Sequence, residues 1–305
     1  MALPRAGSEG RVAIVTGAGR GVGRAEAHHL AARGYAVVVN DWDDGTSGDA
    51  TPLADTVVKE IIERGGTAIA DYNDVATGTA AKSMVEETVR QFGRIDVLVN
   101  NAGIHRSEPF TSMPEHTFDE VLRVCLKGHI EPSRAVATWW LHSDDGRFDK
   151  HRRIINTTSL AGIYGSASST TAYATSKAAI IGLTWSLARE LQGLGATVNA
   201  IAPRAATRMS AGKPQLRPAG DVDRFAPDRV APLVGWMAGP ASQEFTGRIF
   251  VVGGGQVWLI RPFDVFGPHQ LLDEADRESL PVDLAQEEID GSAVPGWTEI
   301  EARFA

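Results

Sequence analysis

The sequence predicts an α/β fold of the Rossmann type, a doubly wound parallel sheet with helices on both faces. From Arg11 onward, short runs rich in β-branched residues alternate with longer amphipathic stretches. Such alternation is typical of consecutive βαβ units, which build a parallel sheet. A glycine-rich turn follows the first of these runs. The sequence has no internal repeat and no apolar run as long as a membrane span, so we expect one large α/β domain.

The short runs are predicted strands because they are apolar, β-branched and bounded by Gly, Pro, Asn or Asp. They cover residues 11–17, 35–41, 67–74, 95–103, 152–159, 196–203 and 247–255. The stretches between them have apolar residues at helical spacing, and several end at a glycine. These predicted helices cover residues 23–34, 52–66, 80–93, 114–141, 173–193 and 228–239, with Pro132 inside the fourth.

Three polar stretches interrupt the alternation, at residues 42–52, 143–151 and 204–227. The first and third follow predicted strands, at the sheet edge where ligands bind in such folds. We therefore expect one domain over residues 11–255, with a substrate lid at about 204–229. Residues 256–305 form a predicted acidic C-terminal extension, which carries 11 acidic and 3 basic residues against 27 of each in the remainder.

Composition narrows the possible functions. The net charge of −8 offers no basic footprint for nucleic acid. Cys125 is the one cysteine, which excludes an intrachain disulfide and a cysteine-based metal site. The first ten residues have no apolar stretch of the kind a secretory signal needs. We expect a cytoplasmic protein that acts on a small molecule, with no metal, membrane or nucleic-acid partner.

The glycine-rich turn predicts a dinucleotide site. Gly17, Arg20, Gly21, Val22 and Gly23 lie between a strand and a helix, where backbone N–H groups can approach a pyrophosphate. The next strand ends in Asp41. A carboxylate there can accept hydrogen bonds from an adenosine ribose and repels a 2′-phosphate, which favours NAD over NADP. Arg20 is the counter-observation because it can pair with a phosphate, and a glycine-rich turn without a ligand is the simpler alternative.

Tyr173 and Lys177 lie one helical turn apart, so they share a face of a helix. Ionising a tyrosine near pH 7 costs about 4 kcal/mol, which the surroundings must supply before it can work as a phenolate. One cation at about 4 Å supplies about that amount at an effective dielectric of about 20. Ser159 comes before them and can hydrogen-bond a carbonyl or hydroxyl oxygen. Together they predict an acid–base site.

These motifs resemble the short-chain dehydrogenase/reductase family. The resemblance covers residues 11 to about 255 and lies in residues 16–23 (TGAGRGVG), 100–103 (NNAG), Ser159 and 173–177 (YATSK). It implies that Tyr173 is the acid/base, that Lys177 binds the nicotinamide ribose and lowers the tyrosine pKa, and that Ser159 holds the substrate oxygen. It also implies further cofactor contacts, at Asp74, Val75, Asn100, Asn101, Ala102, Gly103, Pro203 and Thr207.

The chain departs from the family pattern at three places. Cys125 stands where the family often has an asparagine that holds a water of a proton relay, and a thiol is a poor substitute for an amide. Arg204 replaces the usual glycine after Pro203. The interval from Ser159 to Tyr173 is one residue longer than is common, and we expect the extra residue in the loop before Tyr173.

Within the family, the chain resembles the (3R)-hydroxyacyl-CoA dehydrogenase modules of peroxisomal multifunctional β-oxidation enzymes. That similarity implies NAD-dependent oxidation of a 3-hydroxyacyl-CoA or a hydroxysteroid. The lid contains a run of basic residues that suits a CoA phosphate or a carboxylate, although a solvated basic loop explains it equally well. They are Arg204, Arg208, Lys213 and Arg217.

Other functions stay open on the sequence alone. One is an NADP-dependent ketone reductase, and another is an NAD-binding sensor or scaffold without turnover. Family members usually pair through the helices that correspond to residues 115–140 and 173–192, which implies a homodimer or homotetramer. Trp139 and Trp140 can line that interface or pack in the core. The C-terminal extension, with Trp297 and Phe304, is either a docking arm or a solvated tail.

Overall fold

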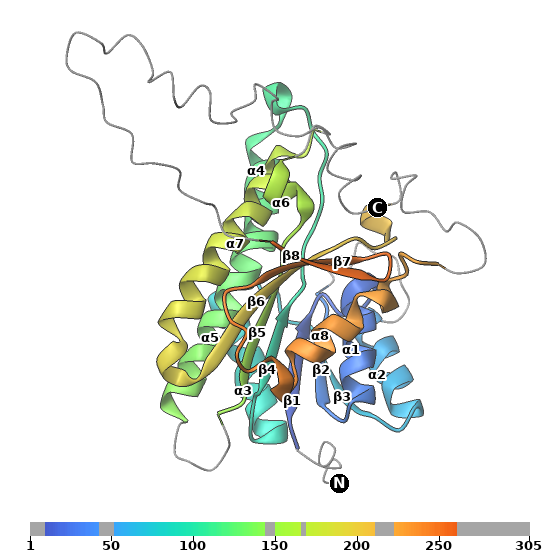
Figure 1. Cartoon of the computed structure of the whole chain (residues 1–305), viewed down its shortest axis with the longest axis vertical. Helices are drawn as coiled ribbons and strands as arrows, with labels where there is room; N and C mark the ends of the chain where they lie inside the picture. The colour runs from blue at the N-terminus through green and yellow to red at the C-terminus, as the bar shows by residue number, and fades with distance from the viewer. Residues whose placement is uncertain (1–9, 43–51, 144–149, 166–168, 211–222, 261–305) are drawn as a thin grey trace, which may run out of the picture.

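A computed structural model describes residues 10–42, 52–143, 150–165, 169–210 and 223–260 (Figure 1). An eight-stranded sheet lies at its centre, in the order β3-β2-β1-β4-β5-β6-β7-β8. The first seven strands in this order are parallel, and β8 pairs antiparallel with β7. The predicted doubly wound α/β fold is confirmed.

Every predicted strand is present, within a few residues of its expected bounds. The strands are β1 Val12–Thr16, β2 Ala36–Asn40, β3 Thr67–Asp71, β4 Val97–Asn100, β5 Arg152–Thr157, β6 Ala196–Pro203, β7 Ile249–Gly253 and β8 Gln256–Ile260. All residues of β1, β2 and β4 are buried, as expected for parallel strands covered on both faces.

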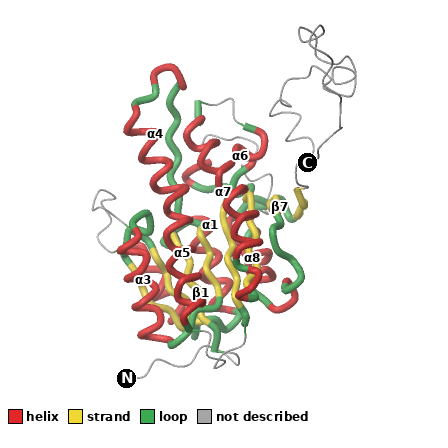
Figure 2. Tube along the Cα trace, turned by 90° about the vertical axis from the view of Figure 1, so that its left-hand side faces the viewer, coloured by secondary structure: helices red, strands yellow, loops and turns green. Residues whose placement is uncertain are grey.

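Helices cover both faces of the sheet (Figures 1 and 2). The α-helices are α1 Gly21–Ala32, α2 Leu53–Glu63, α3 Gly78–Phe92, α4 Glu115–Leu122, α5 Gly128–His142, α6 Leu160–Tyr164, α7 Thr171–Glu190 and α8 Ala231–Met237. Helices α1, α2 and α8 pack on one face against side chains such as Val15 and Val39. Helices α3, α5 and α7 pack on the other, against the alternate residues Ile14 and Val38.

The prediction of one continuous helix over residues 114–141 is wrong. The segment is divided into α4, a π-helical turn over Arg123–Lys127, and α5. Pro132 has no N–H to donate to the carbonyl of Gly128, so regular α-helical bonding is interrupted where α5 begins. π-Helical turns inside helices are frequent at functional sites, and this one lies beside the catalytic residues described below.

The sheet continues beyond Gly255, where the sequence predicts the end of the domain. Gly254 and Gly255 have φ of +63° and +82°, which suits a two-residue hairpin turn. The next five residues then pair with β7 as β8. Trp258 and Ile260 pack on a cluster that includes residues of α6, whereas Val257 and Leu259 are exposed. The rest of the predicted extension, 261–305, lies outside the described residues.

No helix among the described residues is long and apolar enough to span a bilayer.

Glu26 is the least expected buried group of the fold. Its carboxylate lies in α1, is fully buried, and neither oxygen has a hydrogen-bond partner. Burial raises the pKa of Glu26 to about 8, so the folded protein holds it as a neutral acid at neutral pH.

This burial predicts a pH-dependent stability. Between pH 4.5 and about 8 the folded chain keeps a proton that the unfolded chain loses, so the free energy of unfolding falls as pH rises. For one group the slope is about 1.4 kcal/mol per pH unit. We expect Glu26→Gln to remove this slope and to be more stable than wild type at pH 8. Urea unfolding between pH 5.5 and 8.5 measures it, with Glu63→Gln on exposed α2 surface as control. Equal slopes in wild type and Glu26→Gln would contradict the prediction.

Candidate active site

The predicted site residues meet at the carboxyl ends of β1, β4, β5 and β6. The glycine-rich turn follows β1 and opens α1. Gly17 has φ of +61°, which favours glycine. A Cβ at Gly23 would overlap the Asn101 side-chain amide and the Gly17 carbonyl, so only glycine lets α1 approach the strand ends this closely. Val22 is buried behind the turn, and Arg20 is exposed at its tip.

Asp41 lies against this turn. One of its carboxylate oxygens accepts a hydrogen bond from the Gly19 N–H at 2.8 Å. A Cβ at Gly19 would lie 2.8 Å from the Asp41 carboxyl carbon, so the carboxylate and the turn are in direct contact. The turn, the start of α1 and this carboxylate together have the shape and donor set that a pyrophosphate and an adenosine ribose require. The residues present therefore fit a nicotinamide dinucleotide.

The segment after β4 is fastened to the same turn. The Thr16 hydroxyl accepts the backbone N–H groups of Asn101 at 3.0 Å and Ala102 at 3.1 Å. The Asn101 amide donates to the carbonyls of Thr16 and Gly17. Asn101 and Ala102 thus lie beside the turn, as the resemblance implies.

Asn100 has side-chain contacts that differ from those of Asn101. Its side chain is fully buried and donates to Ser133 on α5 and to Asn156 on β5. It joins strand to helix inside the protein. Asn101 lies one residue beyond the end of β4, and its side chain bonds to the glycine-rich turn instead.

Asp74 lies beyond the end of β3, next to the buried Val75. One carboxylate oxygen accepts the Ala76 N–H, and the other forms an ion pair with Arg123 at 2.6 Å. The Arg123 guanidinium also lies 5.9 Å from the centre of the exposed Trp42 ring. The sequence motifs did not identify Arg123 and Trp42 as neighbours of Asp74. The position of Trp42 directly after Asp41 is the signal that could have identified Trp42.

Ser159, Tyr173 and Lys177 are brought together by β5 and α7. Ser159 caps the N-terminus of α6 and accepts the Ala161 N–H at 3.2 Å, which orients its side chain. The buried Lys177 ammonium donates to the Thr157 carbonyl at 2.7 Å and lies 5.7 Å from the centre of the Tyr173 ring. The His105 ring contacts the Tyr173 ring edge-on, at 5.1 Å between centroids.

Burial dominates the electrostatics of this group in the protein without cofactor. It raises the pKa of Tyr173, the nearby Cys125 raises it further, and hydrogen bonding with Ser159 lowers it. Burial also lowers the pKa of Lys177, which Cys125 opposes. Lys177 alone does not make Tyr173 a phenolate here, and a further positive charge is needed for the sequence-based estimate to hold.

Cys125 has a defined backbone role. Its thiol donates to the Ile104 carbonyl at 3.2 Å and accepts the Ile104 N–H at 3.3 Å. Its side chain is fully buried and packs in one cluster with Tyr173. A Cβ at Gly103 would lie 3.5 Å from both the thiol and the Lys177 ammonium. Cys125 therefore fixes the segment after β4 against the catalytic residues.

The described ends of the predicted lid lie near β6, β8 and the start of α1. Pro203 ends β6, and Thr207 is next to Gly21 at the start of α1. The Arg204 guanidinium lies 5.3 Å from the Phe225 ring and 5.8 Å from the Trp258 ring. It thus joins both ends of the lid to β8. Of the basic residues predicted in the lid, Lys213 and Arg217 lie outside the described residues.

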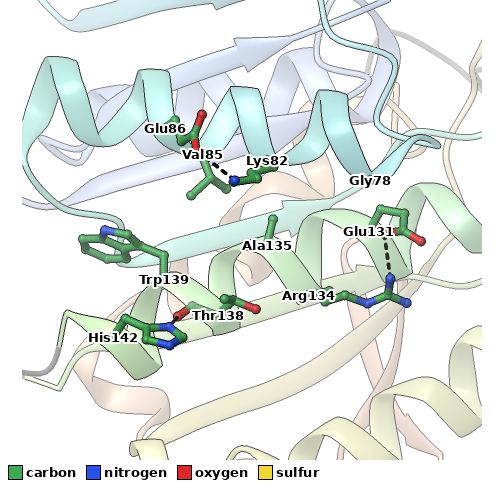
Figure 3. A pocket seen from close by; sticks show the side chains of 10 residues that line it. All are labelled: Gly78, Lys82, Val85, Glu86, Glu131, Arg134, Ala135, Thr138, Trp139 and His142. Atoms are coloured by element: carbon green, nitrogen blue, oxygen red, sulfur yellow. Dashed lines mark hydrogen bonds and ion pairs between the residues drawn. The ribbon is translucent and has the colours of Figure 1, made fainter.

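A groove of about 360 Å³ lies elsewhere, between α3 and α5 (Figure 3). Two ion pairs line it, Lys82–Glu86 and Arg134–Glu131, and Trp139 closes one end. It contains none of the predicted catalytic residues. Trp140 is buried in the core and donates to the Ile95 carbonyl, which excludes it from any subunit interface.

Comparisons with known proteins agree with this geometry. Residues 11–215 match the family model of the short chain dehydrogenase. The chain is 38% identical over 258 residues to the hydroxyacyl-CoA dehydrogenase ChsB1 of Mycobacterium tuberculosis, which covers 83% of this chain and 80% of that protein. A short-chain dehydrogenase structure from Mycobacterium avium has a TM-score of 0.79 and 38% identity, and the match covers 94% of this chain and 96% of that one.

A longer relative matches nearly the whole chain. The peroxisomal hydratase-dehydrogenase-epimerase of Neurospora crassa is 37% identical over 294 residues, which are 96% of this chain. The chain spans only 30% of the length of that relative, so the match concerns one part of a larger protein.

The contacts of Arg204 with two aromatic rings predict how much it contributes to substrate binding. Cation–π contacts are worth about 0.5–1 kcal/mol each at exposed sites. We expect Arg204→Ala to raise the KM for the substrate about five- to thirtyfold, because the lid is held less firmly, while kcat changes less. Arg204→Lys retains the charge without the planar stack and is expected to lie between the two. Steady-state kinetics with the exposed Arg189→Ala as control measures this effect. An unchanged KM in Arg204→Ala would contradict it.

Proposed function

This chain belongs to the short-chain dehydrogenase family, and we propose that it is an NAD-dependent dehydrogenase of secondary alcohols, with a 3-hydroxyacyl-CoA or a hydroxysteroid as substrate. Members of this family are oxidoreductases that use NAD or NADP. The observation that carries the proposal is the meeting of Tyr173, Lys177 and Ser159 at the end of β5, beside a glycine-rich turn that holds Asp41.

A nicotinamide bound beside Lys177 would supply the hydride acceptor and a positive charge. The positive charges of Lys177 and the nicotinamide would favour ionisation of Tyr173, whose own proton passes to solvent before the reaction. The Tyr173 phenolate then takes the proton of the substrate hydroxyl, and Ser159 holds the oxygen from which that proton leaves. Lys177 stabilises the phenolate, because its ammonium is held by the Thr157 carbonyl near the tyrosine ring. In the reverse direction Tyr173 returns the proton to the carbonyl oxygen.

The contact between Asp41 and the turn supports NAD as the cofactor. The carboxylate already accepts the Gly19 N–H, so a 2′-phosphate would approach a fixed negative charge. Arg20, exposed at the tip of the turn, supports the second candidate, an NADP-dependent ketone reductase. We favour NAD because the carboxylate lies against the turn, whereas the Arg20 side chain extends into solvent.

The substrate class rests on the relatives and on the lid. The M. tuberculosis relative is named a hydroxyacyl-CoA dehydrogenase, and the longer relative contains a dehydrogenase among its named activities. In this chain Arg204 and Arg208 place positive charge at the start of the lid, where an anionic substrate would enter.

We further propose a homodimer or homotetramer that pairs through α5 and α7, with the partly buried Trp139 near the interface. A cytoplasmic location stays a prediction.

Substrate turnover tests the proposal. Purified protein is assayed with NAD or NADP against 3-hydroxyacyl-CoAs, hydroxysteroids, small terpenoid alcohols and polyols. We expect NAD reduction with a 3-hydroxyacyl-CoA or a hydroxysteroid, and a loss of about 10²- to 10⁴-fold in Tyr173→Phe, the range of general acid–base catalysis. Cofactor fluorescence titration of the mutant controls for intact binding. Activity confined to polyols, or full activity in Tyr173→Phe, would overturn the proposal.

A charge-only substitution tests cofactor choice. Asp41→Asn keeps an acceptor for the Gly19 N–H and removes the negative charge. Hydrogen bonds to charged groups contribute about 1.5–3 kcal/mol. We therefore expect the ratio of kcat/KM for NAD over that for NADP to fall about 10- to 100-fold. Arg20→Ala is the opposing variant and should leave NAD use unchanged. A wild-type preference for NADP would show that Arg20, and not Asp41, sets the specificity.

A further inference from the structure

The last residue of β5 has backbone groups that no neighbouring strand pairs on one side, although they are buried inside the protein. Strand β4 ends at Asn100, which pairs with Asn156, so β5 extends one residue further. The Thr158 N–H donates to Ile201 on β6. Since consecutive strand residues direct their backbone groups to opposite neighbours, the N–H and carbonyl of Thr157 face the side where β4 has already ended. Both groups are buried and need other partners.

Two side chains satisfy them. The Thr157 carbonyl accepts the Lys177 ammonium at 2.7 Å. The Thr157 N–H donates to Nε2 of His129 through a long bond of 3.4 Å. His129 lies at the start of α5, directly after the π-helical turn, and is fully buried. Thr157 is therefore held on the side that β4 leaves open, its carbonyl by Lys177 and its N–H by His129, a histidine that the proposed mechanism does not otherwise use.

The protonation state of His129 follows from this contact. The Thr157 N–H contact requires an unprotonated Nε2, which places the proton of the neutral imidazole on Nδ1, a buried atom with no hydrogen-bond partner among the described residues. The pKa of His129 is well below its ordinary value, chiefly because of burial and then because of the positive charge of Lys177, while nearby backbone groups oppose both. Lys177 on α7 and Cys125 on the π-helical turn are the titratable groups near it. His129 therefore acts as a neutral acceptor.

We propose that His129 is a positioning residue for the Tyr173–Lys177 pair: by holding the Thr157 N–H, it fixes the carbonyl that fixes the Lys177 ammonium. Without this acceptor, the end of β5 keeps only its bonds to β6, and the lysine loses a rigid anchor. The ammonium then spends less time near the tyrosine. The proposal rests on the proposed function, in which Tyr173 must ionise during the reaction.

The test compares variants at position 129 that differ in the acceptor. His129→Gln keeps an acceptor oxygen at about the reach of Nε2, whereas His129→Met fills a similar volume without one. The pKa of Tyr173 in the NAD complex is read from tyrosinate absorbance, as the difference between each variant and the same variant with Tyr173→Phe. The chain has 4 tyrosines, so this difference isolates one. The pH profile of kcat is measured beside it.

We expect His129→Met to raise the pKa of Tyr173 by about one unit and to lower kcat about tenfold at neutral pH, with recovery at high pH. His129→Gln should stay within about threefold of wild type. Thr184→Val is the matched control, because the Thr184 hydroxyl accepts a hydrogen bond from Asn156 in the same buried layer but does not contact Thr157. If His129→Met does not fold, His129→Asn, whose amide is too short to reach, carries the same comparison.

The inference is overturned if His129→Met titrates like wild type, if His129→Gln shifts as much as His129→Met, or if Thr184→Val shifts equally. Its failure is distinguishable from failure of the proposed function. A wild-type protein that oxidises none of the alcohols contradicts the proposed function, while the tyrosinate titration still decides the role of His129 without any substrate.

Discussion

A buried ammonium group organises the centre of this site. Lys177 is 3% exposed, and burying a positive charge costs several kcal/mol unless a partner compensates for it. The partner is the Thr157 carbonyl, which is available only because β5 extends beyond β4. The Thr158 hydroxyl in turn donates to the Lys177 carbonyl at 2.6 Å. These two bonds fasten α7 to the end of β5 and so set where Tyr173 lies relative to Ser159.

The cofactor side of the site follows the same rule, that backbone groups beyond strand ends are satisfied locally. Thr16 at the end of β1 accepts two N–H groups of the segment after β4, and Asn101 returns two bonds to the glycine-rich turn. Asp41 closes the turn from the other side. The fold thus brings the glycine-rich turn and the group of Ser159, Tyr173 and Lys177 to adjoining strand ends, which keeps both in register with one sheet.

The sequence predicted what depends on local pattern. Strand alternation identified all seven parallel strands, and the spacing of Ser159, Tyr173 and Lys177 identified residues that the fold does bring together. It did not predict the orientation of side chains in the tertiary structure. The sequence does not distinguish the side-chain contacts of Asn100 from those of Asn101, and it does not single out His129 within its helix. The π-helical turn was missed because apolar spacing does not distinguish π-helical from α-helical bonding.

Strand β8 connects Arg204, at the start of the predicted lid, to the helix that Ser159 caps. Trp258 packs with Ile163 and Tyr164 on α6, and α6 begins at its cap, Ser159. The opposite contact of Trp258 is the Arg204 guanidinium, which also lies on Phe225 at the returning end of the lid. Arg204 and Phe225 are therefore linked through Trp258 to the helix that Ser159 caps, so packed side chains connect the segment after β6 with the Ser159–Tyr173–Lys177 group.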